Sequence, residues 1–431
     1  MLNGIFLVVV VLSLLLAAAT GQMEPLAQAL LDDAKKAVTL ALGLVGVMAF
    51  FLGLMRVAQD AGLLRVIARL IAPLMRRLFP SVPVDHPAMS AMILNISSNM
   101  LGLANAATPF GIKAMEELDR LNGRKGTATD AMVLFLAINT SGLALLPTGV
   151  VSLRASLGSQ DAMAILLPTW IASGCATLVG VSAALLLSRL PSVRATAPPA
   201  VAPSSDVASG PTEADAPSSP GASRARLLVA AIVCGTFVWL AARYAWGALA
   251  SAPVSEVIKR LMSSWVLGAL VGGLLLYGWS RGVKVYESLV EGAKEGFQVA
   301  LRIIPYLVAI LVMIAMLRAA GGIDLLVALL SPLTERIGMP AEALPMALLR
   351  PLSGSGAYGV MASVMETHGP DSLIGTMVST FQGSTETTFY VLAVYCGAVG
   401  VTRTRHTLAA CLAADVAGLL TATWVVRLLF G

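Results

Sequence analysis

Polar side chains that could bind a small solute lie in the middle of stretches that are otherwise strongly apolar. They form four groups: Asn95, Ser98, Asn99 and Asn105; Asn139, Thr140 and Ser141; Arg350, Ser353 and Ser355; and Gln382, Ser384, Thr385 and Glu386. Their amides, hydroxyls and charges offer hydrogen-bond donors and acceptors to a polar solute or a cation. In an apolar environment such groups are unfavourable unless protein, water or a ligand satisfies them. We therefore predict one substrate-binding site, formed where folding brings the four groups together.

Two carboxylates within apolar runs are candidates for ion coupling. Glu386 is the only acidic residue of the four groups, and Asp415 lies in the apolar segment from Leu412 to Gly418. A charged side chain at the centre of a membrane helix costs roughly 2.5–3.5 kcal/mol unless it faces a cavity or a partner. We expect Glu386 and Asp415 to anchor a ligand or to couple its movement to H⁺ or Na⁺. The alternative is structural: Glu386 pairs with Arg350, and the hydroxyls and amides only join helix to helix.

The remaining reactive residues do not suggest an enzyme. The sequence has no GxxxxGK[ST] and no HExxH motif, and its three histidines are scattered. The four cysteines lie in apolar runs without CxxC spacing, so we expect them to pack rather than to bind metal or form disulfides. Asp371, after Pro370, is expected to cap a helix, and Glu116 and Glu117 to form a solvated ion-pair face. We predict no catalytic activity, no metal and no cofactor.

The composition is that of a membrane protein. Of the 431 residues, 57% are hydrophobic and 12% are charged, which is too apolar for a soluble globule of this size. The apolar runs do not alternate as the strands of a β-barrel would. The net charge of +5 comes from basic residues between apolar runs, which is typical of cytoplasmic loops rather than of a nucleic-acid-binding surface. We predict an all-α, multi-pass protein of the bacterial inner membrane, surrounded by lipid and without a nucleic-acid partner.

Apolar runs and their interruptions predict the order of the elements. Nine stretches are candidate spans: 4–20, 37–55, 130–150, 163–187, 227–249, 263–280, 297–317, 372–395 and 407–428. The stretches 87–110 and 341–365 are broken by Asn, Ser, Gly or Pro. We predict that both are re-entrant helical hairpins, the alternative being kinked spans. The amphipathic segments 57–79 and 318–337 precede the hairpins, and we expect them to lie in the membrane interface.

The two halves of the chain are related by an internal repeat. Ala61-Gly62 matches Ala320-Gly321 at an offset of 320 − 61 = 259, and the same offset relates Arg77 to Arg336. Residues 189–226, rich in Pro, Ser and Ala, are predicted to be a disordered linker, followed by a connecting span over 227–255. This single extra span would invert the second half, 260–431, relative to the first, 1–188. We predict two inverted repeats, each of about four spans plus a re-entrant hairpin, an architecture common among secondary transporters. Residues 21–36, which are rich in acidic side chains, would then face outward.

Several motifs resemble a known family. The segment from Asn99 to Pro109, followed by Lys113-Ala-Met-Glu116-Glu117, is similar to spore maturation protein A. Arg350-Pro-Leu-Ser353-Gly-Ser355 and the segment from Gln382 to Tyr390 are similar to spore maturation protein B. The chain thus resembles a fusion of the two, both members of the nucleoside-recognition gate group. The resemblance implies a helical membrane protein with re-entrant hairpins and a transport role, but it does not identify a substrate.

From these observations we expect a secondary transporter or facilitator of a small polar solute, nucleoside-like or another metabolite. An alternative is a non-transporting membrane scaffold or regulator of envelope or spore-type maturation. That alternative fits the basic amphipathic segments and the linker, but it leaves the buried polar groups unexplained. An intramembrane enzyme would need a nucleophile or a metal set that the sequence does not offer. The sequence leaves open the identity of the solute, the coupling ion and whether the chain forms a homo-oligomer.

Overall fold

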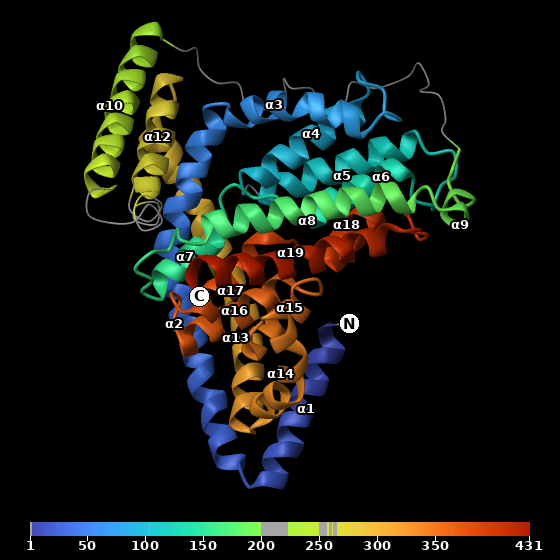
Figure 1. The fold of residues 1–431 in the computed structure, drawn as a ribbon, viewed down its shortest axis with the longest axis vertical. Helices are drawn as coiled ribbons and strands as arrows, with labels where there is room; N and C mark the ends of the chain where they lie inside the picture. Colours follow the sequence, from blue (N-terminus) through green and yellow to red (C-terminus); the bar gives the residue numbers. More distant parts are fainter. Residues whose placement is uncertain (1, 103, 200–222, 250–256, 258–260, 262–264) are drawn as a thin grey trace.

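The computed structural model describes residues 2–102, 104–199, 223–249, 257, 261 and 265–431, which are almost entirely helical (Figure 1). The first half comprises α1 (Leu2–Thr20), α2 (Met23–Asp60), α3 (Leu63–Leu78), α4 (Pro87–Met100), α5 (Ala104–Arg120), α6 (Asp130–Thr140), α7 (Thr148–Ser156), α8 (Leu166–Leu187) and α9 (Pro191–Arg194). Helix α10 (Arg224–Leu249) follows. The second half comprises α12 (Val266–Ser280), α13 (Val285–Ala319), α14 (Gly322–Ile337), the 3-10 turn η3 (Ala341–Ala343), α15 (Leu344–Leu349), α16 (Gly354–His368), α17 (Leu373–Ser384), α18 (Thr388–Ala398) and α19 (Thr407–Phe430).

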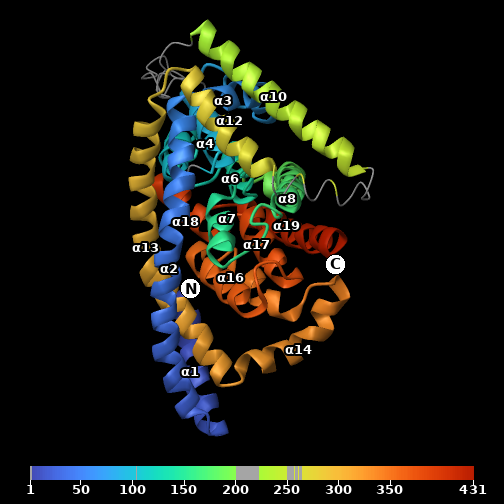
Figure 2. The same ribbon diagram turned by 90° about the vertical axis from the view of Figure 1, so that its left-hand side faces the viewer.

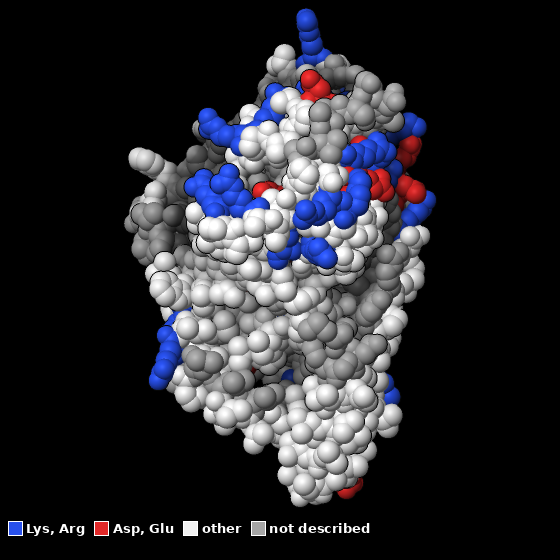
Figure 3. All heavy atoms as spheres, turned by 90° about the vertical axis from the view of Figure 1, so that its right-hand side faces the viewer, with Lys and Arg blue, Asp and Glu red and all other residues white. Residues whose placement is uncertain are grey.

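Several helices are apolar enough to identify a membrane protein. Among the described residues, α8, α10 and α19 are each long and apolar enough to span a bilayer. The second part of α2 and α3 pass the same test together, but they are bent by 69° at their junction, where Gly62 adopts a positive φ of 80°. Figure 3 shows Lys and Arg gathered towards one end of the molecule, while the rest of that face carries little charge. This uneven distribution is typical of proteins that follow the positive-inside rule.

The long helices α2 and α13 extend beyond the spans predicted for them. Residues 23–36, which we expected between two spans, are instead the first turns of α2, because they are rich in Ala, Leu, Gln and Lys. Pro25 is tolerated because it lies in the first turn. Figures 1 and 2 show α2 and α13 side by side along the long axis, while α8 and α19 run across it. Glycine permits this close approach: a Cβ on Gly292 would lie 2.7 Å from the carbonyl oxygen of Leu52.

Both predicted hairpins are pairs of helices separated by a short break, and two predicted spans are broken. Helices α4 and α5 pack along each other, as do α15 and α16. The predicted span 130–150 is divided into α6 and α7, and 372–395 is divided into α17 and α18. The breaks follow from composition, since the first contains Gly142 and Pro147 and the second is a Ser-Thr-Glu-Thr run.

The predicted linker 189–226 begins and ends with folded residues. Its first part forms α9 and contacts both halves, because Val193 accepts a hydrogen bond from Arg405 (3.0 Å) and Pro199 accepts one from the backbone of Gly123 (3.1 Å). Helix α10 starts at Arg224, within the range predicted for the linker. Residues 200–222 lie outside the described part of the chain, as do 250–255 of the predicted connecting span.

Corresponding helices of the two halves contact each other in a reciprocal pattern. Helix α1 packs on α13 and α12 packs on α2. Likewise α6 packs on α19 and α17 on α8, while α7 contacts α17 and α18 contacts α6. The helices α2 and α13, and also α8 and α19, pack directly on one another. Residues of both halves also pack together in each of the two main hydrophobic clusters.

Candidate functional site

The two helix breaks lie in direct backbone contact. The N–H of Glu386 donates a hydrogen bond to the carbonyl of Thr140 (2.8 Å), the last residue of α6. Gly142 has a φ of +60°, and a Cβ there would lie 2.7 Å from the carbonyl carbon of Thr385. Only glycine fits this position, so the sequence encodes the approach. The second and fourth polar groups are therefore brought together, one from each half, as the sequence predicted.

The first hairpin joins the first break through a pair of amides. The side chain of Asn99 donates a hydrogen bond to the side chain of Asn139 (2.9 Å), and the backbone N–H of Leu145 donates to the carbonyl of Met100 (2.8 Å). Asn95 faces elsewhere: its amide donates to Ala107 and to the hydroxyl of Tyr395 in α18 (3.1 Å). The side chain of Asn105 lies outside the described part of the chain.

The second hairpin joins the second break through Arg350. This buried guanidinium donates hydrogen bonds to the hydroxyl of Thr387 (3.0 Å) and to the carbonyls of Gln382 (3.2 Å) and Thr385. It also lies 3.6 Å from the carboxylate of Glu386. The last carbonyls of a helix have no partner within the helix and carry partial negative charge, so a cation at the end of α17 stabilises the break.

The two predicted serines of the second hairpin are not part of the Arg350 contacts. Ser353 caps α16 by accepting a hydrogen bond from the N–H of Gly356 (3.0 Å), and the half-buried Ser355 lies in the first turn of that helix. The glycines of this turn, Gly354-x-Gly356-x-x-Gly359, have the spacing of a dinucleotide-binding loop. Here they follow α15 rather than a strand. A Cβ on Gly354 would lie 2.7 Å from the Thr387 hydroxyl, which explains a glycine at this position.

Most of the predicted hydroxyls are satisfied within the protein. They bond to carbonyls of their own helix, or in one case to Thr177 as well; these residues are Ser98, Thr140, Ser141, Ser384 and Thr385. These hydroxyls therefore act as the structural alternative expected, by making hydrogen bonds within the protein. By contrast, buried atoms near the breaks lack a protein partner, including Oε1 of Gln382, Nε of Arg350, Oγ1 of Thr169 and Oδ1 of Asp415. These atoms have hydrogen-bonding capacity that the protein does not use.

The two carboxylates differ in their surroundings. The Glu386 side chain is 54% exposed and lies near Arg350. Asp415 is only 2% exposed, and its Oδ2 accepts a hydrogen bond from the hydroxyl of Thr388 (2.7 Å), the first residue of α18. Both acids therefore border the second break, one at its surface and one behind it.

Two ion pairs between the halves were not predicted. The fully buried Arg154 of α7 lies 2.8 Å from Asp371 before α17, and Arg405 before α19 lies 2.6 Å from Asp130 at the start of α6. The predicted capping role of Asp371 is wrong, because Ser372 accepts the capping hydrogen bond from Gly375 (2.9 Å). An aspartate at the start of each broken helix was the signal available in the sequence.

The predicted solvated face of Glu116 and Glu117 is only partly correct. Glu117 is buried rather than solvated, and it is held by Lys113 (2.9 Å) and Arg120 (3.1 Å). Only Glu116 lies at the surface. The buried His86 lies nearby and caps α4 by accepting a hydrogen bond from the N–H of Ala88 at Nδ1 (3.2 Å). Burial lowers the pKa of His86, although the charge of Glu117 opposes that shift.

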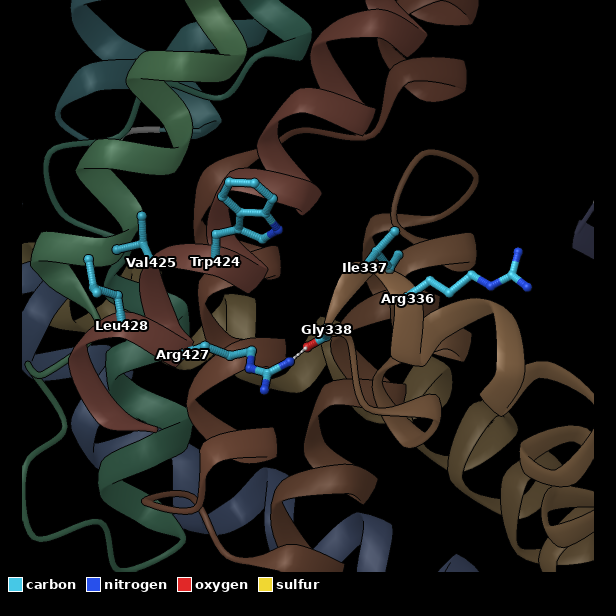
Figure 4. Close-up of a pocket in the computed structure, with 7 residues that line it drawn as sticks. All are labelled: Arg336, Ile337, Gly338, Trp424, Val425, Arg427 and Leu428. Carbon is cyan, nitrogen blue, oxygen red and sulfur yellow. Dashed lines mark hydrogen bonds between the residues drawn. The ribbon is translucent and has the colours of Figure 1, made fainter.

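A pocket of about 620 Å³ lies apart from the helix breaks, between the ends of α14 and α19. Figure 4 shows Arg427 reaching towards Gly338, to whose carbonyl it donates a hydrogen bond (3.1 Å), while Arg336 points away from it. The pocket contains none of the predicted site residues and faces outward beside the exposed Trp424 and Leu428. We therefore place the candidate site at the breaks rather than in this pocket.

Comparison with known proteins identifies the family. The family described as Gate, nucleoside recognition, matches residues 41–157 and 300–402. The chain belongs to the nucleoside-recognition gate family. Each matched segment contains one hairpin and one helix break, and the two segments begin 300 − 41 = 259 residues apart, the offset of the internal repeat.

Two relatives each match a little under half of the chain. Spore maturation protein B of Bacillus subtilis (strain 168) is 46% identical over 176 residues, which are 41% of this chain and 98% of that protein. Spore maturation protein A of the same organism is 39% identical over 189 residues, 44% of this chain and 94% of that protein. This gate protein therefore combines relatives of both in one polypeptide, as the motifs indicated. The structure of the Alcanivorax borkumensis YdaH transporter is 15% identical and covers 98% of this chain and 96% of that chain, with a TM-score of 0.43. That score does not establish a common fold.

Proposed function

We propose that this gate protein is a secondary transporter or facilitator of a small polar solute, nucleoside-like or another metabolite, in the bacterial inner membrane. The observation that carries the proposal is the contact between two broken helices, one from each half. Helix ends and unwound backbone at such a junction supply donors and acceptors for a solute. Buried atoms of Gln382, Arg350 and Thr169 have no protein partner there, which supports a ligand at this position.

We further propose that the halves are inverted repeats, related by a two-fold axis in the membrane plane, and that both hairpins are re-entrant. In a two-fold arrangement each contact between unlike elements occurs twice, with the roles exchanged. The packing of α6 on α19 and of α17 on α8 follows this rule. The two ion pairs are alike only in outline: each joins an arginine of one half to an aspartate at the start of a broken helix of the other, Arg154 with Asp371 and Arg405 with Asp130.

The proposed binding site lies between the breaks and the hairpin tips. We place Asn99, Asn139, Gln382, Arg350 and Glu386 nearest to the solute. The buried hydroxyls of the predicted set stabilise the breaks around it. H⁺ or Na⁺ is the proposed coupling ion, and the chain is proposed to have no catalytic activity.

A second candidate is a non-transporting membrane scaffold or regulator of maturation. The names of the two relatives, both spore maturation proteins, favour this possibility. Exposed Arg69, Arg76 and Arg77 on the amphipathic helix α3 would suit a protein or lipid partner on one membrane face. This candidate does not require the polar junction to be accessible to solutes.

Reconstitution of the purified protein separates these candidates. A thermal-shift screen of nucleosides and other polar metabolites would identify solutes that bind, because a ligand of the folded state raises the melting temperature. Counterflow of each radiolabelled hit into proteoliposomes would then measure transport. Gln382→Leu should abolish both signals, and Gln298→Leu, the same change on the exposed side of α13, should preserve them. Binding without counterflow would favour the scaffold, and conversion of the hit to a product would indicate an enzyme.

A further inference from the structure

Asp415 has the surroundings of a carboxyl group that binds a proton. It lies within α19, is 2% exposed, and accepts one hydrogen bond at Oδ2 from Thr388. Its other oxygen, Oδ1, is buried without a partner in the protein. An ionised carboxylate has two accepting oxygens and strongly disfavours such burial, whereas a protonated carboxyl is neutral. A proton on this group therefore removes the unfavourable buried charge.

The helices packed against α19 offer Asp415 little charge compensation. Neither α8 nor α17 contains Asp, Glu, Lys, Arg or His, and α6 contains only Asp130 at its first residue. Helix α18 contributes tyrosines and Cys396, and Cys411 lies one turn earlier in α19 itself. The charged groups that act on Asp415 are Arg350 and Glu386. Arg350 directs its hydrogen bonds to Thr387 and the α17 carbonyls and pairs with Glu386, so its hydrogen bonds go to the break rather than to Asp415.

Asp415 is also positioned to act on the second break. Its hydrogen-bond partner Thr388 is the first residue of α18, adjacent to the Thr387 that holds Arg350. One turn along the same face, α19 touches the break directly, because a Cβ on Gly418 would lie 2.7 Å from Cγ2 of Thr385. The positive end of α18 favours the ionised form of Asp415 and burial favours the protonated form. A change of protonation thus alters the force that holds α18 at the break.

We propose that Asp415, rather than Glu386, is the group that binds and releases a proton, so that solute movement is coupled to H⁺. The proton binds to a carboxylate oxygen of Asp415 and leaves again to water, with no other bond formed or broken. Glu386, half-exposed beside Arg350, anchors the ligand or the break. The coupling rests on the proposed transport function, whereas proton binding by Asp415 does not.

Infrared spectroscopy tests proton binding without any solute. The full-length protein in liposomes would be titrated, and the C=O stretching band of protonated carboxyl groups would be followed. We expect a titrating band that is lost in Asp415→Asn and retained in Glu386→Gln. A band that persists in Asp415→Asn, or that is lost only in Glu386→Gln, would overturn the assignment. If Asp415→Asn does not fold, Thr388→Val, which removes the hydrogen bond to Asp415, should shift the band and its titration; an unchanged band would contradict the proposal.

A flux measurement tests coupling, with radiolabelled uridine as the first probe. In wild-type proteoliposomes an imposed pH gradient should drive accumulation, and a Na⁺ gradient should not. Asp415→Asn should lose accumulation yet retain counterflow, because exchange needs no net proton movement. Counterflow with Na⁺-driven accumulation would overturn H⁺ coupling while leaving transport intact. If uridine and every other nucleoside in the panel show no counterflow, the proposed transport is wrong; the infrared titration still decides whether Asp415 binds a proton.

Discussion

The two helix breaks share one design but differ in chemistry. At the first, a neutral amide pair joins the hairpin to the broken helix, Asn99 to Asn139. At the second, the hairpin supplies a cation, Arg350, which binds carbonyls at the end of α17 and lies beside Glu386. Asp415 stands directly behind this second break. The difference indicates a division of roles: the first break can recognise a solute through neutral hydrogen bonds, and the second can respond to charge.

Removing the cation should have the largest effect on stability. Arg350→Met leaves the buried carbonyls of Gln382 and Thr385 without a donor, and we expect a loss of about 3 kcal/mol. Arg350→Lys should recover only part of it, because an ammonium cannot reproduce the planar set of donors. The measurement is thermal unfolding in detergent, with the exposed Arg336→Met as control. A variant Arg350→Met as stable as the wild type would show that charge does not hold the second break.

Of the two ion pairs between the halves, Arg154–Asp371 should stabilise the protein more than Arg405–Asp130. Asp371 accepts hydrogen bonds from Arg154, Ser159 and the backbone of Gln160, so we expect Asp371→Asn to cost about 2 kcal/mol. The more exposed Asp130, paired with Arg405, should cost only about 0.5 kcal/mol when changed to Asn. Melting temperatures of both variants, measured at low and high salt, would check this order. Equal losses would show that the two ion pairs contribute equally to stability.

The neutral pair at the first break should matter less for stability and not at all for pH dependence. Asn139→Leu leaves the half-buried Asn99 amide without its acceptor, for an expected cost of about 1 kcal/mol. Solute binding should be lost, while the infrared band assigned to Asp415 should be unchanged. The control is Asn122→Leu, which removes a buried amide that bonds to Asp119 and Thr127, away from the breaks. A shifted carboxyl band in Asn139→Leu would show that the two breaks are not chemically separate.

The sequence predicted those features that depend on local composition. The polar groups around Asn139 and around Glu386 were predicted to meet, and the two candidate spans that contain them are broken next to these groups. Their contact also followed from the repeat, which places both breaks at corresponding positions. The pair Arg154–Asp371 could not be predicted, because its members lie 217 residues apart and no local pattern links them. The prediction that Glu117 is solvated was wrong for a related reason. Its spacing to Lys113 and Arg120 is the same on a buried helix face as on a solvated one.

The smallest effect concerns two histidines that belong to neither break. Burial lowers the pKa of both His86 and His406, and the charge of Arg405 adds to the shift of His406. An unfolded chain has histidine pKa values of about 6.5, so below that pH it binds more protons than the folded protein. Stability should therefore be highest above about pH 6.5 and fall as the pH is lowered towards about 5.

Amide side chains can replace these histidines, because they keep the hydrogen bonds but have no group that binds a proton in this pH range. In His86→Asn the amide oxygen can cap α4, and in His406→Gln the amide can still donate to the carbonyl of Ala184, the partner of His406 Nε2. Each should flatten the decline of melting temperature with falling pH, and the exposed His368→Gln should not. Asp415→Asn should leave the decline in place, because a buried carboxyl group that is protonated in the folded protein is not destabilised as the pH falls. A decline that persists in the double histidine variant would contradict the assignment of this pH dependence to His86 and His406.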